Sequence, residues 1–378
     1  MKVLLVTQRF PWPPYTGERL RATIWLAALA RSVEVSVVAP RGDVPGDAPP
    51  FRFFAARRSP MHAFRGAVQV LRDGLPFQCL LGTTHDWASA VADARAAAGP
   101  FDATIVILSR MHPWVRASLD GRVLLDAVDS LRRSAAERAK AATPPLRWLW
   151  RIEERRMARL EREAVDAYER VIVVSEEETA ELRAIAIPVG IDAAPLAPDA
   201  PRAFDFGFWG RLPYFANADA ASWLLREIWP AIRALHPSAT LVIGGAGAAR
   251  TLREEAQRSG VTLVSPIDDV RAFARSIRVA LMPLRYGSGQ SNKILEAAEA
   301  GCALVGTPCA FRGLAALAEH AHVEESAEGF ARAAVALVTD DARRESEARA
   351  LRNVVETRYD RAVTRDRMRA IVRGEAAA

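Results

Sequence analysis

Short apolar runs alternate with longer amphipathic stretches along most of this 378-residue chain. The apolar runs are rich in Val, Ile and Leu, as in KVLLVT at 2–7 and DATIVIL at 102–108. Strands that alternate with helical patterns are typical of βαβ units, in which helices join buried parallel strands. The predicted fold class is therefore α/β, with doubly wound parallel sheets.

The predicted strands form two sets on either side of a proline-rich segment. They lie at 2–7, 33–39, 102–108, 122–126 and 170–174, and then at 205–209, 239–243, 261–264, 279–283 and 303–306. The segment at 186–203 holds four prolines and little charge, which indicates a linker, and the length of the chain also favours two domains. We expect an N-terminal domain at 1–190, a linker at 191–203, a second domain at 204–355, and a C-terminal helix at 356–378 that packs back towards the first domain. A long charged helix is predicted at 145–167.

Composition excludes several classes of protein. No apolar run approaches the roughly 18 residues of a membrane-spanning helix, and the first run ends at Gln8, too early for a signal peptide. Cys79, Cys302 and Cys309 have no zinc-like spacing, and no Asp-x-Asp pair or His cluster is present, so no resident metal or disulfide is expected. The net charge of +6 is modest and no nucleic-acid motif occurs. We expect a cytoplasmic protein that binds no nucleic acid.

Residues 51–72 (FRFFAARRSPMHAFRGAVQVLR) contain five arginines, no acidic residue and several large apolar side chains. This mixture suits peripheral contact with an anionic membrane, here the inner face. A solvated helix lining a cleft for anionic substrates explains it equally well. The sequence leaves both interpretations open.

The most informative motif is the glycine-rich turn between the strand at 279–283 and a helix beginning near Asn292. Gly287 and Gly289 allow backbone N–H groups to approach a ligand, and the helix N-terminus favours anions. Lys293 and Glu296 share one face of the first turn, where they can reach a phosphate and two vicinal hydroxyls. Lysine is rare in this arginine-rich chain, so its presence at this position favours a phosphate site.

A second strand-to-helix turn follows the strand at 205–209 and precedes a helix near Asn217. In this turn Gly210 permits close approach of the backbone to a ligand, and the planar guanidinium of Arg211 can donate two hydrogen bonds to phosphate oxygens. In the first half, the loop FPWPPYTGER at 10–19 carries Gly17 and either holds a ligand or only stiffens the turn. Ligands in doubly wound domains bind at the carboxyl ends of the strands, so a cleft between the two domains is the expected site. His112 follows the strand at 102–108 and is predicted to face this cleft.

Asp126 and Asp129 also follow a strand end. They are further candidates for the cleft, with helix capping by Asp129 as the alternative.

Taken together, Gly210-Arg211-Leu212, the run GSGQSNKILEA at 287–297 and RGL at 312–314 resemble the retaining glycosyltransferases of family four, which have the two-domain GT-B fold. The resemblance covers nearly the whole chain. Within that family, the segments QSNKILEA and NADAASWLLREIWPAI most resemble the sequences of exopolysaccharide-associated sugar transferases. The resemblance to this family implies two domains that face each other across a cleft.

The resemblance also implies a nucleoside-diphosphate sugar as donor substrate, no cofactor, and an alcohol acceptor that is a sugar, a lipid-linked molecule or a small molecule. Lys293 and Arg211 would bind the diphosphate, Glu296 the ribose, and Gly17 would close over the diphosphate or acceptor. Such enzymes need no protein nucleophile. The candidate catalytic residues are His112, Arg211 and Lys293. The candidate donor-binding residues are Gly17, Gly210, Arg211, Ser288, Gly289, Gln290, Ser291, Lys293, Ile294, Leu295 and Glu296.

The chain departs from the family pattern at two positions. Ser288 stands where many members have a glutamate that contacts the donor sugar, and no lysine follows the Gly-Arg pair, so Lys293 would supply that charge. We expect a metal-independent hexosyltransferase that acts in polysaccharide or glycoconjugate synthesis. The alternatives are a nucleotide-sugar epimerase or hydrolase on the same fold, and a non-catalytic protein that binds membrane surfaces.

Overall fold

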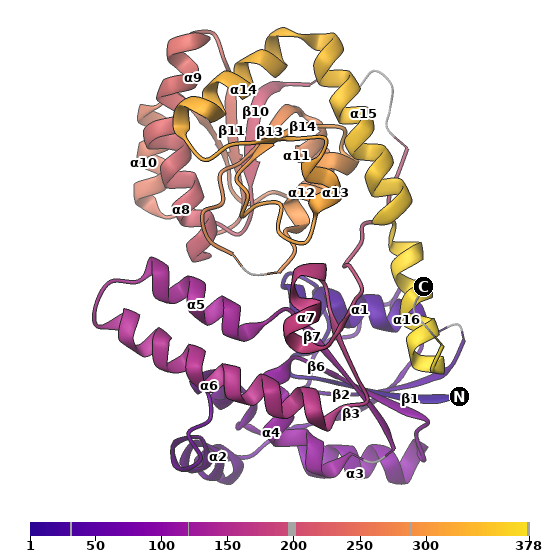
Figure 1. Ribbon diagram of the computed structural model, residues 1–378. Helices are drawn as coiled ribbons and strands as arrows, with labels where there is room; N and C mark the ends of the chain where they lie inside the picture. The colour runs from indigo at the N-terminus through magenta and orange to yellow at the C-terminus, as the bar shows by residue number, and fades with distance from the viewer. Residues whose placement is uncertain (31, 120, 196–201, 288, 376–378) are drawn as a thin grey trace. The chain divides into compact units, whose positions relative to one another are not determined.

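The computed structural model describes residues 1–30, 32–119, 121–195, 202–287 and 289–375. The described chain divides into two compact units (Figure 1). Unit 1 comprises Met1–Val189 together with the residues from Thr364 on, and unit 2 comprises Gly190–Val363.

Unit 1 is built on a parallel sheet in the order β3-β2-β1-β6-β7-β8-β9. Its strands are β1 (Lys2–Thr7), β2 (Glu34–Ala39), β3 (Arg52–Ala55), β6 (Ala103–Ile107), β7 (Arg122–Val128), β8 (Arg170–Val173) and β9 (Ile185–Ala186). Two short strands, β4 (Arg57–Arg58) and β5 (His85–Asp86), form a separate antiparallel pair. The helices are α1 (Gly17–Leu29), α2 (Pro60–Arg72), α3 (Trp87–Ala98), α4 (His112–Val115), α5 (Leu131–Ala141), α6 (Leu146–Ala167), α7 (Thr179–Leu182) and α16 (Arg361–Arg373), which belongs to unit 1 from Thr364 on. Short 3-10 helices lie at η1 (Phe77–Gly82), η2 (Ser109–Met111), η3 (Arg116–Ser118) and η4 (Glu176–Glu178).

Alternate residues of each strand in unit 1 enter separate cores on the two faces of the sheet. Val3 and Leu5 of β1 pack with α1 and α16, whereas Leu4 and Val6 pack with α3 and the end of α6. Successive side chains of a strand point to opposite faces, so strands that are buried on both sides carry the continuous apolar runs seen in the sequence.

Helix α16 comes from the far end of the chain and completes unit 1. Met368, Ile371 and Val372 lie in the same core as α1, and Arg369 donates to the Ala28 carbonyl of α1 at 3.1 Å. Figure 1 shows α16 beside α1. The expectation that the last helix packs against the first domain is confirmed for these residues.

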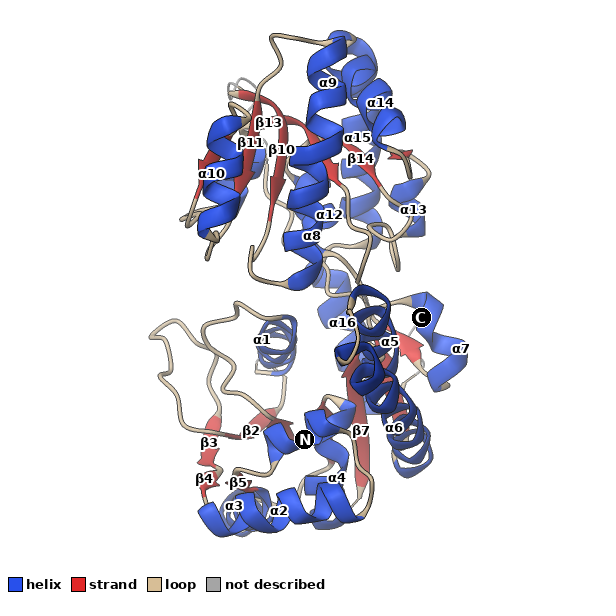
Figure 2. Ribbon diagram, turned by 90° about the vertical axis from the view of Figure 1, so that its left-hand side faces the viewer, coloured by secondary structure: helices blue, strands red, loops and turns tan. Residues whose placement is uncertain are grey.

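Unit 2 contains a second parallel sheet, in the order β12-β11-β10-β13-β14-β15. The strands are β10 (Phe204–Trp209), β11 (Leu241–Gly244), β12 (Thr262–Val264), β13 (Ile277–Met282), β14 (Ala303–Gly306) and β15 (His322–Val323). The helices around this sheet are α8 (Phe215–Trp223), α9 (Trp229–Leu235), α10 (Arg250–Arg258), α11 (Val270–Arg275), α12 (Asn292–Glu299), α13 (Ala315–Ala318), α14 (Ala327–Thr339) and α15 (Asp341–Arg358) (Figures 1 and 2). A π-helical turn, η5 (Leu224–Ile228), lies between α8 and α9. One continuous apolar core holds this unit together.

Every strand predicted from the sequence is present, and the long helix predicted at 145–167 is α6. The α/β class with parallel sheets is therefore confirmed. The interpretation of residues 51–72 as a single helix is wrong, because residues 52–55 form β3 at the edge of the sheet and α2 begins only at Pro60. No helix in the described part of the chain is long and apolar enough to cross a bilayer.

Candidate functional site

The strand order of unit 2 reverses between β10 and β13. From β10 the chain continues outward through β11 and β12, and from β13 it continues through β14 and β15 on the other side. In open α/β sheets, ligands bind outside the carboxyl ends of the strands at such a switch point. The turn at Gly210–Arg211 follows β10 and the loop at 283–291 follows β13, so both predicted motifs lie at this position.

The side chain of Lys293 passes directly over Gly210. A Cβ atom on Gly210 would lie 2.4 Å from Cε of Lys293 and 2.9 Å from Nδ2 of Asn217, closer than real Cβ atoms come to such neighbours. Asn217 is buried, and its Nδ2 donates to the Arg211 carbonyl at 2.8 Å, which fixes the turn. Glycine at position 210 is therefore what leaves room for the Lys293 side chain at the end of β10.

Lys293 is held in a partly buried position. Burial lowers the pKa of its ammonium group, and the nearby Glu296 carboxylate opposes that shift. Among the described residues, no ion pair of Lys293 with a carboxylate is formed. Its charge is thus available to an anion, whose binding would also favour the protonated form.

Helix α12 begins without a side-chain cap. Ser291 occupies the capping position but accepts no bond from the first turn, and its Oγ has no partner among the described residues. The Oδ1 atom of Asn292 is likewise buried without a described partner. Gly289 has the left-handed φ of 69° that lets the loop turn into the helix. Unsatisfied N–H groups and polar atoms at a helix N-terminus form a site suited to an anion.

Glu296 lies one turn further along α12. Its Oε2 atom accepts from Nε1 of Trp209, the last residue of β10, at 2.7 Å. Burial raises the pKa of the Glu296 carboxyl, and the Trp209 bond, Lys293 and Arg361 oppose this shift. The hydrogen bond from Trp209 joins the two predicted motifs and fixes the carboxylate beside Lys293.

Other side chains anchor the loop at 283–291. Arg312 donates to the Gly287 carbonyl at 2.7 Å, Gln290 donates to the Gly313 carbonyl at 3.3 Å, and Arg285 forms a two-bond pair with Asp219 of α8. The loop is therefore tied both to the segment after β14 and to the helix after β10. The Gln290 amide is committed to this anchoring by the bond that the structure shows.

The remaining donor-side candidates of unit 2 differ in what they can contribute. Arg211 is exposed, and its guanidinium makes no hydrogen bond or ion pair with the described residues. Ile294 and Leu295 are buried in the core, so a side-chain contact between either of them and a ligand is excluded, and only their backbone can take part. Ser288 lies outside the described residues.

In unit 1, Gly17 and His112 occupy different surroundings. Gly17 is the first residue of α1, and a Cβ there would meet nothing within 4 Å, so an open space adjoins it. The His112 ring packs against Tyr168, with ring centroids 5.6 Å apart, and burial lowers its pKa. Tyr168 precedes β8 and lies at the amino ends of the strands, whereas ligands bind at their carboxyl ends. The prediction that His112 faces the ligand is therefore not supported.

The loop at 10–19 owes its shape to its aromatic residues. The Phe10 ring meets the Phe53 ring of β3 edge-on, with ring centroids 5.4 Å apart, and Trp12 stacks on Phe51 with centroids 5.7 Å apart. These contacts support the interpretation that the aromatic part of the loop stiffens the turn.

Asp126 has a structural role. Its carboxylate is fully buried and accepts from Arg21 and Trp25 of α1 at 2.6 Å each. Helix α5 is capped by the Ser130 hydroxyl, so the predicted capping by Asp129 is wrong by one residue.

A polar cluster that the sequence did not reveal lies at the switch point of unit 1, between β1 and β6. Gln8 follows β1 and Arg110 lies just after β6, and Nε of Arg110 donates to Oε1 of Gln8 at 2.7 Å. Arg110 also pairs with Glu18 at 3.3 Å. Burial raises the pKa of Glu18, and Arg110 opposes this shift. Nε2 of Gln8, Oε1 of Glu18 and Oγ of Ser109 are buried without a described partner, so the cluster has unused donors and acceptors.

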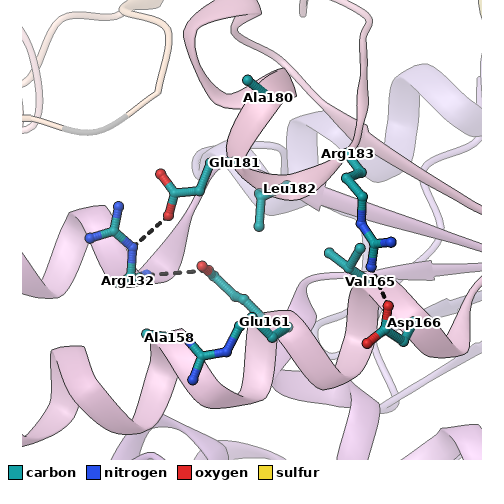
Figure 3. Close-up of a pocket in the computed structure, with 10 residues that line it drawn as sticks. Arg132, Ala158, Glu161, Val165, Asp166, Ala180, Glu181, Leu182 and Arg183 are labelled. Carbon is teal, nitrogen blue, oxygen red and sulfur yellow. Dashed lines mark hydrogen bonds and ion pairs between the residues drawn. The ribbon is translucent and has the colours of Figure 1, made fainter.

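Unit 1 also has a surface pocket of about 450 Å³ that contains none of the candidate residues (Figure 3). Arg132 pairs with Glu181 at 2.5 Å, and its backbone N–H donates to Glu161. Arg183 pairs with Asp166 in the same pocket. Because these charges bind one another, the pocket offers a ligand little that is unsatisfied, and we assign it no role.

Comparison with known proteins bears on both units. Residues 203–340 match the model of a family described as glycosyl transferases group 1, a span that includes Gly210, Lys293 and Glu296. No curated protein sequence matches the chain closely enough to indicate a relative. Among solved structures, a sucrose-phosphate synthase from Thermosynechococcus elongatus is similar over 99% of this chain and 98% of its own, with a TM-score of 0.76 and 15% identity. The fold is GT-B. Two further structures share the GT-B fold, each over 99% of this chain and 100% of its own length. One is HepE from Anabaena, with a TM-score of 0.69 and 13% identity, and the other is WaaG, a glycosyltransferase involved in lipopolysaccharide biosynthesis, with a TM-score of 0.65 and 17% identity.

Proposed function

We propose that this chain is a retaining glycosyltransferase that moves a sugar from a nucleoside-diphosphate donor to a hydroxyl acceptor in polysaccharide or glycoconjugate synthesis. The observation that carries the proposal is the arrangement at the switch point of unit 2. There Lys293 passes over Gly210, the N-terminus of α12 is uncapped, and Glu296 lies one turn away. The match of residues 203–340 to glycosyl transferases group 1 supports it, as do structures of HepE with UDP and UDP-glucose.

Each group in this arrangement suits one part of such a donor. The ammonium of Lys293 and the N–H groups at the start of α12 suit the two phosphates, and the exposed Arg211 guanidinium adds a flexible second cation. The Glu296 carboxylate can accept two hydrogen bonds, as the vicinal hydroxyls of a ribose require. The three-residue spacing of Lys293 and Glu296 matches the short distance between a ribose and its diphosphate.

The reaction breaks the bond between the anomeric carbon and the diphosphate oxygen and forms one from that carbon to the acceptor oxygen. In the proposed mechanism the acceptor proton passes to the departing phosphate, so no protein nucleophile is needed. Lys293, Arg211 and the α12 N-terminus stabilise the negative charge that develops on the diphosphate. We propose that these positive groups make a bound metal unnecessary, so a chelator should leave turnover unchanged.

The acceptor is proposed to bind unit 1 at the cluster formed by Gln8, Glu18 and Arg110. Its unused amide, carboxylate and Ser109 hydroxyl atoms are the donors and acceptors that a polyhydroxyl molecule needs. Glu18→Gln should raise the KM for the acceptor and leave the Kd for the nucleotide unchanged. An unchanged acceptor KM would remove the cluster from the proposal.

The proposal is tested by pairing two lysine substitutions. Nucleotides are first screened by thermal shift with UDP, GDP, ADP and dTDP, because a ligand that binds the folded state raises Tm. Turnover is then measured with sugars of the stabilising nucleotide. Lys293→Ala should lower turnover at least tenfold, the effect of losing about 1.5–3 kcal/mol from a charge-assisted contact.

Lys140→Ala serves as the matched control, because Lys140 is exposed and pairs only with the neighbouring Glu137 at 3.0 Å among the described contacts. It should leave turnover unchanged. Full activity in Lys293→Ala, with the fold confirmed by circular dichroism, would refute the assignment of Lys293 to the donor diphosphate and with it the proposed function.

A further inference from the structure

Helix α2 presents a stripe of apolar side chains to solvent. Met61, Phe64, Val68 and Leu71 are all exposed, Phe64 at 71% and Leu71 at 69%. Their spacing of three, four and three residues places them along one side of the helix. We call these four residues the α2 stripe. A surface helix normally buries its apolar side, so a stripe turned outward marks an interaction surface.

The inner side of α2 is packed firmly against unit 1. A Cβ on Gly66 would lie 2.5 Å from Cγ2 of Thr83, and Val70 is fully buried with Met157 and Leu160 of α6. The Ser59 hydroxyl caps the helix by accepting from the backbone N–H of His62. The α2 stripe therefore points outward because the other side of the helix is fixed, and a rotation that would bury the stripe is prevented.

Arginines adjoin the α2 stripe on the same segment. Arg57, Arg58 and Arg65 are exposed, and none of them forms an ion pair with a described residue. Residues 51–72 contain no acidic residue. Outside the segment, Asp73 pairs with Arg72, and Asp86 lies opposite Arg57 across β4 and β5. The positive charge beside the apolar stripe is therefore carried by the three arginines that form no described ion pair.

The start of α6 repeats this chemistry. Trp148 is 63% exposed, and Leu149 and Ile152 are exposed beside it. Arg151 lies over the Trp148 ring at 5.5 Å, which leaves its charge at the same surface. The hairpin of α5 and α6 and helix α2 both lie towards the left-hand side of unit 1 in Figure 1, the side that faces the viewer in Figure 2.

We propose that unit 1 docks on an anionic lipid bilayer through the α2 stripe, with the start of α6 as a second contact. Phe64, Leu71 and Trp148 would insert among the acyl chains near the headgroups, while the arginines would pair with anionic lipid phosphates. This arrangement is that of an interfacial helix, which lies in the plane of the membrane and needs no spanning segment.

Charge favours a bilayer over a protein partner as the occupant. Arg57, Arg58 and Arg65 form no ion pair with a described residue, so their charges suit a surface of continuous negative charge, and each contributes to the affinity through that charge. Aromatic and aliphatic side chains beside them suit the acyl boundary just below. The proposal concerns where the enzyme works and is independent of which sugar it transfers.

The test is sedimentation of the full-length protein with vesicles of phosphatidylcholine alone or mixed equally with phosphatidylglycerol, at low and high salt. The wild-type protein should bind the mixed vesicles at low salt and much less at high salt. Phe64→Ser with Leu71→Ser should weaken this binding at least about tenfold, because two apolar side chains lose their burial. Arg57→Gln with Arg58→Gln and Arg65→Gln should remove the preference for phosphatidylglycerol.

The control is Leu235→Ser, which changes an exposed leucine of unit 2 (55% exposed) and should leave vesicle binding unchanged. Melting temperatures should stay close to that of the wild type in every variant, since all these positions are exposed. Equal sedimentation of wild type and Phe64→Ser/Leu71→Ser would overturn the proposal. A dimer in light scattering that the same pair of substitutions dissociates, without vesicle binding by the wild type, would show instead that the α2 stripe is a protein interface.

Discussion

Replacing Gly210 by alanine would insert one carbon atom between the turn after β10 and the side chain of Lys293. The new Cβ would lie 2.4 Å from Lys293 Cε, whereas carbon atoms in contact are normally about 3.5–4.0 Å apart. The ammonium must therefore move by about 1 Å or more, since the buried Asn217, 2.9 Å away on another side, is held by its bond to Arg211. The charge is retained but displaced.

A displacement of about 1 Å in a positioned group can cost up to about a hundredfold in rate. We expect Gly210→Ala to lower kcat/KM by about 10- to 100-fold in a donor-turnover assay, which corresponds to about 1.4–2.7 kcal/mol. In the Lys293→Ala background the same substitution should add little, because the group that it displaces is already absent.

The matched control is Gly260→Ala in the same unit. Gly260 also has a positive φ, of 65°, but a Cβ there would meet nothing within 4 Å. Both variants should lose about 1–2 kcal/mol of stability to backbone strain. Only Gly210→Ala should lose turnover. Wild-type kcat/KM in Gly210→Ala, or losses that add in full to those of Lys293→Ala, would refute the steric argument.

Three further substitutions test other parts of the structure. Asp126→Ala should destabilise unit 1 by about 3–5 kcal/mol, seen as a lower Tm, because the Arg21 charge stays buried without its partner; a Tm near wild type would contradict the buried pair. Burial raises the pKa of Glu178 to about 8, well above its unfolded value, so the folded form retains a proton that the unfolded chain releases, and stability should fall as pH rises from about 4.5 to 8. Glu178→Gln should flatten that slope in urea titrations across the pH range, and an unchanged slope would assign it to other groups. Burial also raises the pKa of Glu296, so this carboxylate takes up its proton at a higher pH than an ordinary carboxyl group does. Nucleotide affinity measured by calorimetry should therefore weaken at that higher pH on acidification, and Glu296→Gln should remove the pH dependence. A pH dependence that persists in the variant would exclude Glu296 as its source.

The sequence predicted the long central strands because both of their faces are buried and their apolar runs are continuous. It did not predict β3 or β15, since edge strands are short and partly exposed and carry no such run. β3 also lies within residues 51–72, where the mixture of arginines and apolar residues suggested a solvated helix as one of two interpretations. Local pattern therefore identifies the middle of a sheet better than its edges.

The candidate site in unit 2 could be predicted because its residues lie in two compact motifs. The bond from Trp209 to Glu296 could not, since it joins residues 87 positions apart. The cluster of Gln8 and Arg110 escaped prediction for the same reason, with 102 positions between its members. The signal that could have found it is positional, because Gln8 and Arg110 follow the ends of the two strands that flank the switch point.

The return of α16 to unit 1 has a consequence for how the chain folds as it is synthesised. Residues 368–372 leave the ribosome only after all of unit 2, yet they complete the core that contains Val3, Leu5 and Trp25. During translation unit 2 can close its own core first, while one face of the first sheet stays partly uncovered. The earliest residues to be made are thus among the last to be sheltered from water, and a chain that stalls within unit 2 would expose that apolar face to chaperones and proteases.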